Sequence, residues 1–311
     1  MRIAWALLTF TAIIAAADAL GWGHGYINLL LLTVSSLVAA WFLTSRGWGI
    51  TFDAFLAFSL FVAALSLVQI AYGFPRARGP FGSANYMGAF AALMVFLAVR
   101  RRGRFGITAI IANVGSLAMA QSRGAILAAG AGALVLTART RPRLAAATGA
   151  GAIFAALLLD LARSSVADHS RLAAWKIGAR VAGQRLLLGW GQGGVTITTV
   201  QDGLIVAGIH QFYSVPLDWL IAGGVFGLAA GVWVIVEALR AARDESAVTA
   251  LLVAWIVSGM FIYDTAATAI PLFAVFGYLA SKYRNPAGSA GIVDDRKPFL
   301  NGGMRAGRPH R

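Results

Sequence analysis

Long apolar segments, separated by short connections that carry arginine, constrain the fold of this chain more than any other feature. The segments cover residues 3–20, 26–44, 51–72, 86–99, 105–120, 125–137, 144–161, 215–239, 247–263 and 266–280. A membrane-spanning helix needs about 20 apolar residues, and somewhat fewer where flanking arginines reach the lipid headgroups. We therefore predict an all-α, polytopic membrane protein with about ten transmembrane helices.

The composition points to the same class of protein. Of the 311 residues, 59% are hydrophobic and 12% are charged, about half the charged fraction of a soluble domain. The net charge of +14 is spread over the connections rather than gathered in a patch, which favours lipid phosphates over nucleic acid as partners. The chain has no cysteine and four histidines, so we expect neither a disulfide nor a metal site, and we predict no other cofactor.

The distribution of basic residues predicts how the chain is oriented. Connections rich in Lys and Arg stay on the cytoplasmic side. With the N-terminus inside, 18 of the 26 basic residues fall in cytoplasmic connections or in the C-terminal tail. We therefore expect a protein of the bacterial inner (cytoplasmic) membrane with both termini in the cytoplasm, a transmembrane domain over residues 1–281 and a disordered basic tail over residues 282–311. A cleaved signal peptide is disfavoured, because its loss would leave an odd number of spans.

The remaining eight basic residues fall on the predicted periplasmic face. Arg76, Arg78 and Arg123 lie in short connections, the last at a hairpin tip predicted for residues 121–124. The other five lie in the single long loop, residues 162–214. Cations held outside against the usual bias, beside apolar helices, are typical of sites that hold an anion. The alternative for all three arginines is that they anchor helix ends to lipid headgroups.

The long loop is predicted to contain a short amphipathic helix from Arg171 to about Leu187, capped by Ser170. One face of this helix would carry Leu172, Trp175, Ala179, Ala182 and Leu186. We expect that face to rest on the mouth of the bundle, with Arg171 at its edge. The glycines of residues 189–194 then end the helix.

Four motifs follow one another in the order RGPFGSAN (78–85), QSRGA (121–125), SR with a tryptophan and then LGWG (170–175 and 188–191), and HQFY (210–213) ahead of GVFGL (224–228). In this order and topology they resemble the O-antigen ligase and polymerase superfamily of bacterial membrane glycosyltransferases, over roughly half the chain. The resemblance implies a metal-independent enzyme at the periplasmic face. It would move a glycan from an undecaprenyl diphosphate carrier to a sugar or lipid-sugar acceptor in the assembly of lipopolysaccharide or exopolysaccharide, with a polysaccharide assembly complex as a candidate partner.

The same resemblance implies roles for single residues. Arg123 and Arg171 match the arginines that contact the diphosphate, and His210 matches the histidine near the acceptor hydroxyl. The substrate-binding residues are expected to be Arg76, Arg78, Asn85, Trp175, Gln211 and Asp218. The residue chemistry agrees, since guanidinium stays charged and binds phosphate through two N–H groups, and histidine titrates near neutral pH.

The chain departs from the usual pattern of that superfamily at two positions. Gln211 stands where an asparagine is usual, and Ala222 where an acidic residue is usual. Asp218, one helical turn earlier, is the expected substitute. Both departures fall in the acceptor region. Because a polymerase and a ligase differ in their acceptors, both activities stay open as predictions.

Two other classes of function fit the sequence. A transporter or flippase for an anionic solute or a lipid-linked glycan would be expected to carry ionisable residues near the bilayer midplane, and often internal repeats. This chain instead concentrates its unusual charges at one face and shows no repeat. A non-catalytic scaffold within a polysaccharide assembly complex is the third alternative.

Overall fold

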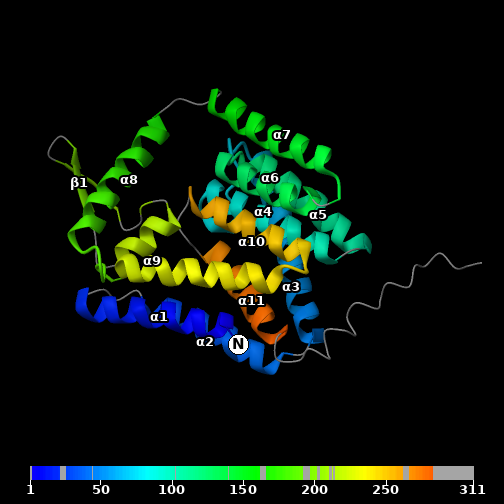
Figure 1. Ribbon diagram of the computed structural model, residues 1–311. Helices are drawn as coiled ribbons and strands as arrows, with labels where there is room; N and C mark the ends of the chain where they lie inside the picture. Colours follow the sequence, from blue (N-terminus) through cyan, green and yellow to red (C-terminus); the bar gives the residue numbers. More distant parts are fainter. Residues whose placement is uncertain are drawn as a thin grey trace, which may run out of the picture.

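Eleven α-helices and a two-stranded hairpin occupy most of the residues that the computed structural model describes, which are 2–21, 26–43, 45–101, 103–138, 140–161, 166–191, 197–201, 204–209, 212, 214–261 and 266–282 (Figure 1). The helices are α1 (Arg2–Gly21), α2 (Tyr26–Phe42), α3 (Ser45–Ala71), α4 (Ala84–Arg101), α5 (Gly103–Ala120), α6 (Arg123–Ala138), α7 (Pro142–Leu161), α8 (Val166–Gln184), α9 (Val215–Ala242), α10 (Ser246–Gly259) and α11 (Ala266–Lys282). A 3₁₀ turn, η1 (Gly79–Phe81), precedes α4. The strands β1 (Ile197–Gln201) and β2 (Leu204–Ile209) pair antiparallel between α8 and α9.

The helices lie where the apolar segments predict them. The chain turns between α5 and α6 at residues 121–122, as expected for the hairpin tip, and α8 begins at Val166, about one turn before its predicted start. The pairing of β1 with β2 is a feature that the helical prediction missed. Its sequence signal is Asp202-Gly203 between two runs rich in β-branched residues, a pattern typical of hairpins. Residues 283–311, predicted to be a disordered tail, lie outside the described residues.

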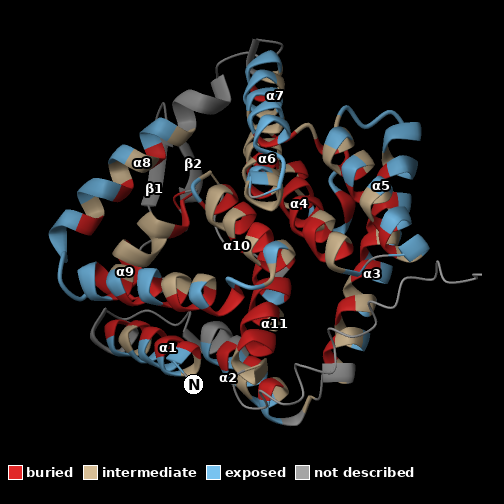
Figure 2. Cartoon of the chain, turned by 45° about the vertical axis from the view of Figure 1, so that its right-hand side comes forward, coloured by how far each residue is buried: buried red, intermediate tan, exposed pale blue. Residues whose placement is uncertain are grey.

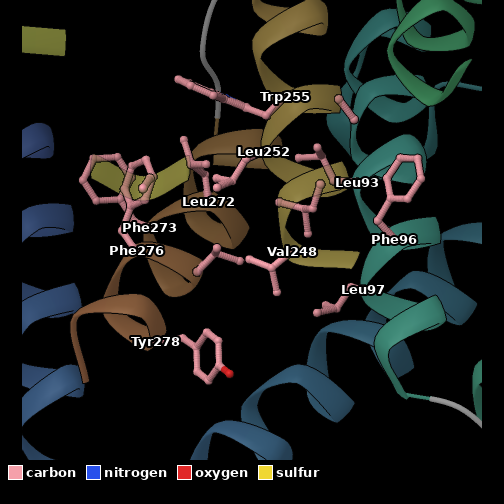
Figure 3. Packing of buried hydrophobic residues seen from close by; sticks show 14 of the residues in the cluster. Leu93, Phe96, Leu97, Val248, Leu252, Trp255, Leu272, Phe273, Phe276 and Tyr278 are labelled. Atoms are coloured by element: carbon pink, nitrogen blue, oxygen red, sulfur yellow. The ribbon is translucent and has the colours of Figure 1, made fainter. Parts of the chain in front are cut away.

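Helix α4 forms the centre of the bundle. It packs against α3, α5, α6, α10 and α11, and it is buried on nearly all sides because its residues are almost all apolar or small (Figure 2). Large side chains of α4, α10 and α11 form much of the buried hydrophobic cluster (Figure 3), among them Leu93, Phe96, Leu97, Val248, Leu252, Trp255, Leu272, Phe273 and Phe276. This packing holds α4 in place, and polar contacts form at both of its ends, through Asn85 at the N-terminal end and Arg100 at the C-terminal end.

Glycines on α6 bring its neighbours unusually close. A Cβ added at Gly132 would lie 2.4 Å from the Phe96 ring of α4 and 2.7 Å from the Ala250 carbonyl oxygen of α10. A Cβ added at Gly130 would lie 2.2 Å from the Ala152 Cβ of α7. Small residues at such crossings allow helix backbones to approach, as is common between membrane-spanning helices.

Many large apolar side chains are exposed on the outer surface of the bundle. Four helices among the described residues are long and apolar enough to cross a membrane, and they lie in α3 (Gly47–Ala71), α5 (Gly103–Ala120), α7 (Pro142–Leu159) and α9 (Val215–Ala242). Large apolar side chains such as Trp41 and Ile50 are 65% and 73% exposed. Such a surface suits lipid rather than water. The chain is therefore described as a membrane protein with four candidate spans, and these lengths do not confirm the predicted ten.

A charged cluster ties several elements together at the C-terminal end of α4. Arg100 Nε donates to Glu245 Oε2 at 3.2 Å and Arg100 Nη2 to the Tyr278 hydroxyl at 3.1 Å, while Lys282 Nζ donates to Glu245 Oε1 at 3.0 Å. We name these four residues the Arg100 cluster. Burial would raise the pKa of the Glu245 carboxyl, but hydrogen bonds from Tyr278 and Lys282 and the charge of Arg100 outweigh it, so this pKa lies below its ordinary value. The other end of α4 is about 25 Å away along the helix.

Candidate functional site

At the N-terminal end of α4, Arg76 binds the tip of the α5–α6 hairpin. Its Nε donates to the Ala120 carbonyl oxygen at 2.9 Å, and its Nη2 donates to Asn85 Oδ1 at 3.0 Å and to the Gln121 carbonyl oxygen at 3.3 Å. The last carbonyl groups of a helix have no hydrogen-bond donors within the helix, and here the N–H groups of the Arg76 guanidinium are the donors. Two residues predicted to bind substrate, Arg76 and Asn85, are thus joined to each other and hold the tip in place.

The tip itself is a tight turn that packs between α4 and the end of α10. Gln121 adopts φ 47°, a left-handed conformation that ends α5 before α6 begins at Arg123. Gly88 of α4 makes room for the turn, since a Cβ there would lie 2.9 Å from Ser122 Cβ. On the other side, a Cβ at Gly124 would lie 3.0 Å from Phe261 Cβ, at the end of α10. Arg123 therefore starts α6 in a rigid, half-buried position.

The N-terminus of α9 borders the same end of α10. A Cβ added at Gly259 would lie 3.2 Å from Val215 Cγ2. Residues 259–261 thus contact both the hairpin tip that carries Arg123 and the first residue of α9. We name this region, where the tip, the end of α10 and the start of α9 meet, the Arg123 end of the bundle.

Asp218 fixes the segment that enters α9. Its Oδ1 accepts a hydrogen bond from the Phe212 backbone N–H at 3.0 Å, and Phe212 is buried. His210 and Gln211 precede Phe212 directly but lie outside the described residues, as does Tyr213. The position of Asp218 gives it a role that the sequence did not predict, because it orients the backbone of this segment. A carboxylate in the first turn of a helix is also favoured by the helix dipole.

Helix α8 packs on this segment through a face that overlaps the predicted one only in part. Its buried residues are Ala174, Gly178 and Ala182, and a Cβ at Gly178 would lie 2.8 Å from both Phe212 Cδ1 and Leu217 Cδ2. The predicted face was wrong in part, since Leu172, Ala179 and Leu186 are exposed. Ala182 belongs to the predicted face and is buried, whereas Ala174 and Gly178 were not counted in that face, although Gly178 lets α8 approach the large residues Phe212 and Leu217.

Arg171 and Trp175 lie on the N-terminal half of α8, one helical turn apart. Both side chains are half-buried. Within the described part of the chain, the Trp175 indole N–H is buried without a hydrogen-bond partner. Such a donor is costly to leave unsatisfied, which makes Trp175 the clearest candidate on α8 to bind a ligand oxygen.

The glycine-rich segment after α8 joins α9 where that helix is interrupted. Gly224, at φ 63° and ψ −158°, breaks α9. The Val225 N–H donates to the Leu186 carbonyl oxygen at 2.7 Å, and the Ile221 carbonyl oxygen accepts from Trp190 N–H at 2.7 Å. The LGWG motif thus supplies backbone partners that the broken helix lacks, and we name this arrangement the α9 splice.

Arg78 is the remaining cation of the predicted set. Arg78 is exposed, and its backbone N–H donates to Gln69 Oε1 at 2.8 Å. In the described ranges, no group of three or more His, Asp or Glu side chains is placed to hold a metal ion. The tip carries one predicted cation, Arg123, and has Arg76 bound to its backbone, and guanidinium groups suit an anionic oxygen ligand.

No protein-family model matches this chain, and a comparison with curated proteins found no match either. What the protein does is therefore inferred from its residues and their geometry.

Proposed function

We propose that this protein is a membrane glycosyltransferase that moves a glycan from an undecaprenyl diphosphate carrier to a sugar acceptor, as an O-antigen ligase or polymerase does. One observation carries the proposal. The hairpin tip with Arg123 and the start of α9, which follows His210-Gln211, border the same end of α10. That the tip carrying Arg123 lies at the same end of the bundle as the helix that follows His210-Gln211 in sequence supports a common site for the donor and the acceptor.

The chemistry asks for charge rather than for a metal. When the glycosidic bond to the carrier breaks, negative charge develops on the leaving diphosphate oxygen, and Arg123 and Arg171 would stabilise it with permanently charged N–H donors. His210 would take the proton of the attacking acceptor hydroxyl. Asp218 would act on this step as a positioning residue, because it holds the backbone next to His210 and Gln211.

Arg76 and Asn85 would also act as positioning residues in this reaction. Their hydrogen bonds to each other and to the end of α5 hold the tip from which Arg123 projects. Arg78, exposed beside them, and Trp175, with its unpaired indole N–H, remain candidates for contacts to the carrier or the glycan.

In the proposed orientation the Arg123 end faces the periplasm and both termini lie in the cytoplasm of the inner membrane. The helix ends on the side of the Arg100 cluster carry most of the connecting arginines, which favours that side as cytoplasmic. About ten helices would span the membrane, with residues 162–214 as the periplasmic loop.

A transporter or flippase is the second candidate, and the interrupted helix α9 is the observation that favours it. Broken helices in transporters expose backbone groups that bind ions or substrate. Here the α9 splice occupies those groups, since Ile221 and Ala222 accept hydrogen bonds from Trp190 and Gly191. The enzyme is the better supported of the two functions for that reason.

Reconstitution of the full-length chain with an undecaprenyl diphosphate oligosaccharide tests the proposal. Release of undecaprenyl diphosphate would be followed for the wild type, Arg123→Ala, Arg171→Ala and His210→Ala. We expect each variant to lose at least about 100-fold in rate, the usual effect of removing one charge-stabilising group. Arg180→Ala, an exposed residue of α8, is the matched control and should retain the wild-type rate.

Other outcomes separate the alternatives. Equal release from all five proteins would overturn the mechanism. A wild type that releases nothing, but moves the lipid-linked glycan across the bilayer, would identify a flippase. Intact glycan assembly in cells with Arg123→Ala would favour the scaffold. Adding either a second carrier-linked glycan or a lipid-sugar acceptor would separate a polymerase from a ligase.

A further inference from the structure

Three consecutive leucines after α8 are exposed beside α9. Leu186, Leu187 and Leu188 are 46–64% exposed, and Val225 and Phe226, just after the break in α9, are 42% and 52% exposed. The two groups adjoin, because Val225 N–H donates to the Leu186 carbonyl oxygen. These five exposed apolar residues lie on two adjoining segments, and we name them the leucine patch.

The backbone contacts fix the level of the leucine patch along α9. After the break, α9 runs from Val225 to Ala242, a length of about 27 Å at the rise of an α-helix. That length matches the hydrocarbon thickness of a bilayer, about 30 Å. With the part of α9 after the break across the bilayer, the patch would lie at one boundary of the hydrocarbon, although its three leucines belong to residues 162–214, which the sequence predicts to be a periplasmic loop.

A non-helical backbone at this level needs internal hydrogen-bond partners, because lipid offers none. The α9 splice provides them for both segments, through the bonds from Trp190 and Gly191 to α9 and from Val225 to the turn. The turn can therefore meet hydrocarbon with its leucine side chains while its backbone stays paired.

The part of the chain that leads into the leucine patch is basic. Between residues 171 and 191 the sequence holds four basic residues and no acidic one. Lys176, Arg180 and Arg185 are exposed, and the Arg185 guanidinium lies 4.2 Å from the centre of the Trp190 ring. Basic residues beside inserted apolar side chains are the pattern of segments that bind anionic lipid headgroups.

We propose that residues 185–191 are seated in the membrane, with the leucine patch in contact with lipid acyl chains and the neighbouring cations in contact with anionic headgroups. The bilayer is thus the occupant of this surface, and it holds α8 against the start of α9. This inference requires that α9 spans the membrane, but it does not require the proposed reaction.

The absence of native cysteine makes the test direct. Leu187→Cys would carry an environment-sensitive fluorophore in the full-length chain, reconstituted in nanodiscs of phosphatidylcholine and phosphatidylglycerol. Gly183→Cys, exposed one turn earlier with nothing within 4 Å of its Cβ position, is the matched control. Both sites are exposed on the protein, so neither label disturbs packing.

We expect acyl-chain quenchers to quench the label at Leu187→Cys at least threefold more than aqueous iodide does, and the reverse at Gly183→Cys. Equal quenching of both labels by iodide would overturn the proposal. The same result is expected if a protein partner covers the patch in cells, because that partner is absent from the purified system and the label at Leu187→Cys would then lie in water. For the charged part, replacing Lys176, Arg180 and Arg185 by glutamine should reduce the phosphatidylglycerol that stays bound in native mass spectrometry at least twofold. Unchanged retention would show that the cations do not bind headgroups.

Discussion

Replacing Arg76 by lysine separates a structural role for this residue from a role in binding phosphate. The Arg76 guanidinium reaches three acceptors, on Ala120, Asn85 and Gln121. Lysine keeps the charge but cannot reach these acceptors from one planar group. A hydrogen bond that involves a charged group contributes about 1.5–3 kcal/mol, and two of the three bonds are short. Because the side chain is half-buried, water would replace part of the loss, and we expect Arg76→Lys to lower the free energy of unfolding by about 2–3 kcal/mol.

Thermal unfolding of the full-length chain in detergent, followed by tryptophan fluorescence, measures this loss. A change of this size lowers the Tm of a chain of this length by about 3–5 °C. Arg78→Lys is the control, because the Arg78 side chain is exposed, and it should melt within about 2 °C of the wild type. If Arg76→Lys melts together with the wild type, the hydrogen bonds of Arg76 do not hold the hairpin tip, and the structural role assigned to it is wrong.

Three further predictions concern single residues. Asp218→Ala should slow glycan transfer more than Asp218→Asn, because asparagine keeps an oxygen that can accept the hydrogen bond from Phe212 N–H, and the release assay compares the two rates. Gly224→Ala should cost about 3 kcal/mol or more in a thermal melt, since φ is 63° and the Cβ would lie 2.1 Å from a carbonyl oxygen, whereas Gly183→Ala should cost little. Lowering the pH from 7 to about 3.5 should reduce the Tm of the wild type more than that of Glu245→Gln. The pKa of this carboxyl is lowered from its ordinary 4.5, so its stabilisation is present above that value and is lost as the pH falls through the lower, folded-state pKa.

The positions of the helices could be predicted from the sequence because each apolar run is by itself sufficient to indicate a helix, whatever its neighbours are. The turn between α5 and α6 was predictable for the same reason, since the apolar stretch between Arg104 and Arg139 is too long for a single span. The number of spans is a different matter. It depends on how each helix is tilted and covered by its neighbours, and several of the helices are too short to decide it by length alone.

Contacts between distant segments could not be predicted in the same way. The break at Gly224 and the glycines near Trp190 are both visible in the sequence, but nothing in either segment says that each supplies the hydrogen bonds the other lacks. Part of the buried face of α8 was missed, because hydrophobicity alone ranks leucine above Ala174 and Gly178. At a close helix crossing, small side chains form the contact.

For the candidate site, residue types were easier to predict than residue roles. Arg76 and Asn85 were assigned to substrate, yet the structure pairs them with each other and with the end of α5. The hairpin tip with Arg123 and the start of α9 both contact the end of α10, and these contacts depend on how three helices pack. The role of His210 stays a prediction, since this residue lies outside the described part of the chain.

The side of the membrane that the Arg123 end faces can be measured directly with single cysteines and a membrane-impermeant maleimide in intact cells. Tyr72→Cys, at the end of α3 beside Arg76, and Asp244→Cys, beside the Arg100 cluster, are both at highly exposed positions, 82% and 72%. A periplasmic site for carrier-linked glycan predicts that Tyr72→Cys reacts before lysis and Asp244→Cys only after it. Reaction of Asp244→Cys in intact cells, with Tyr72→Cys protected until lysis, would contradict it.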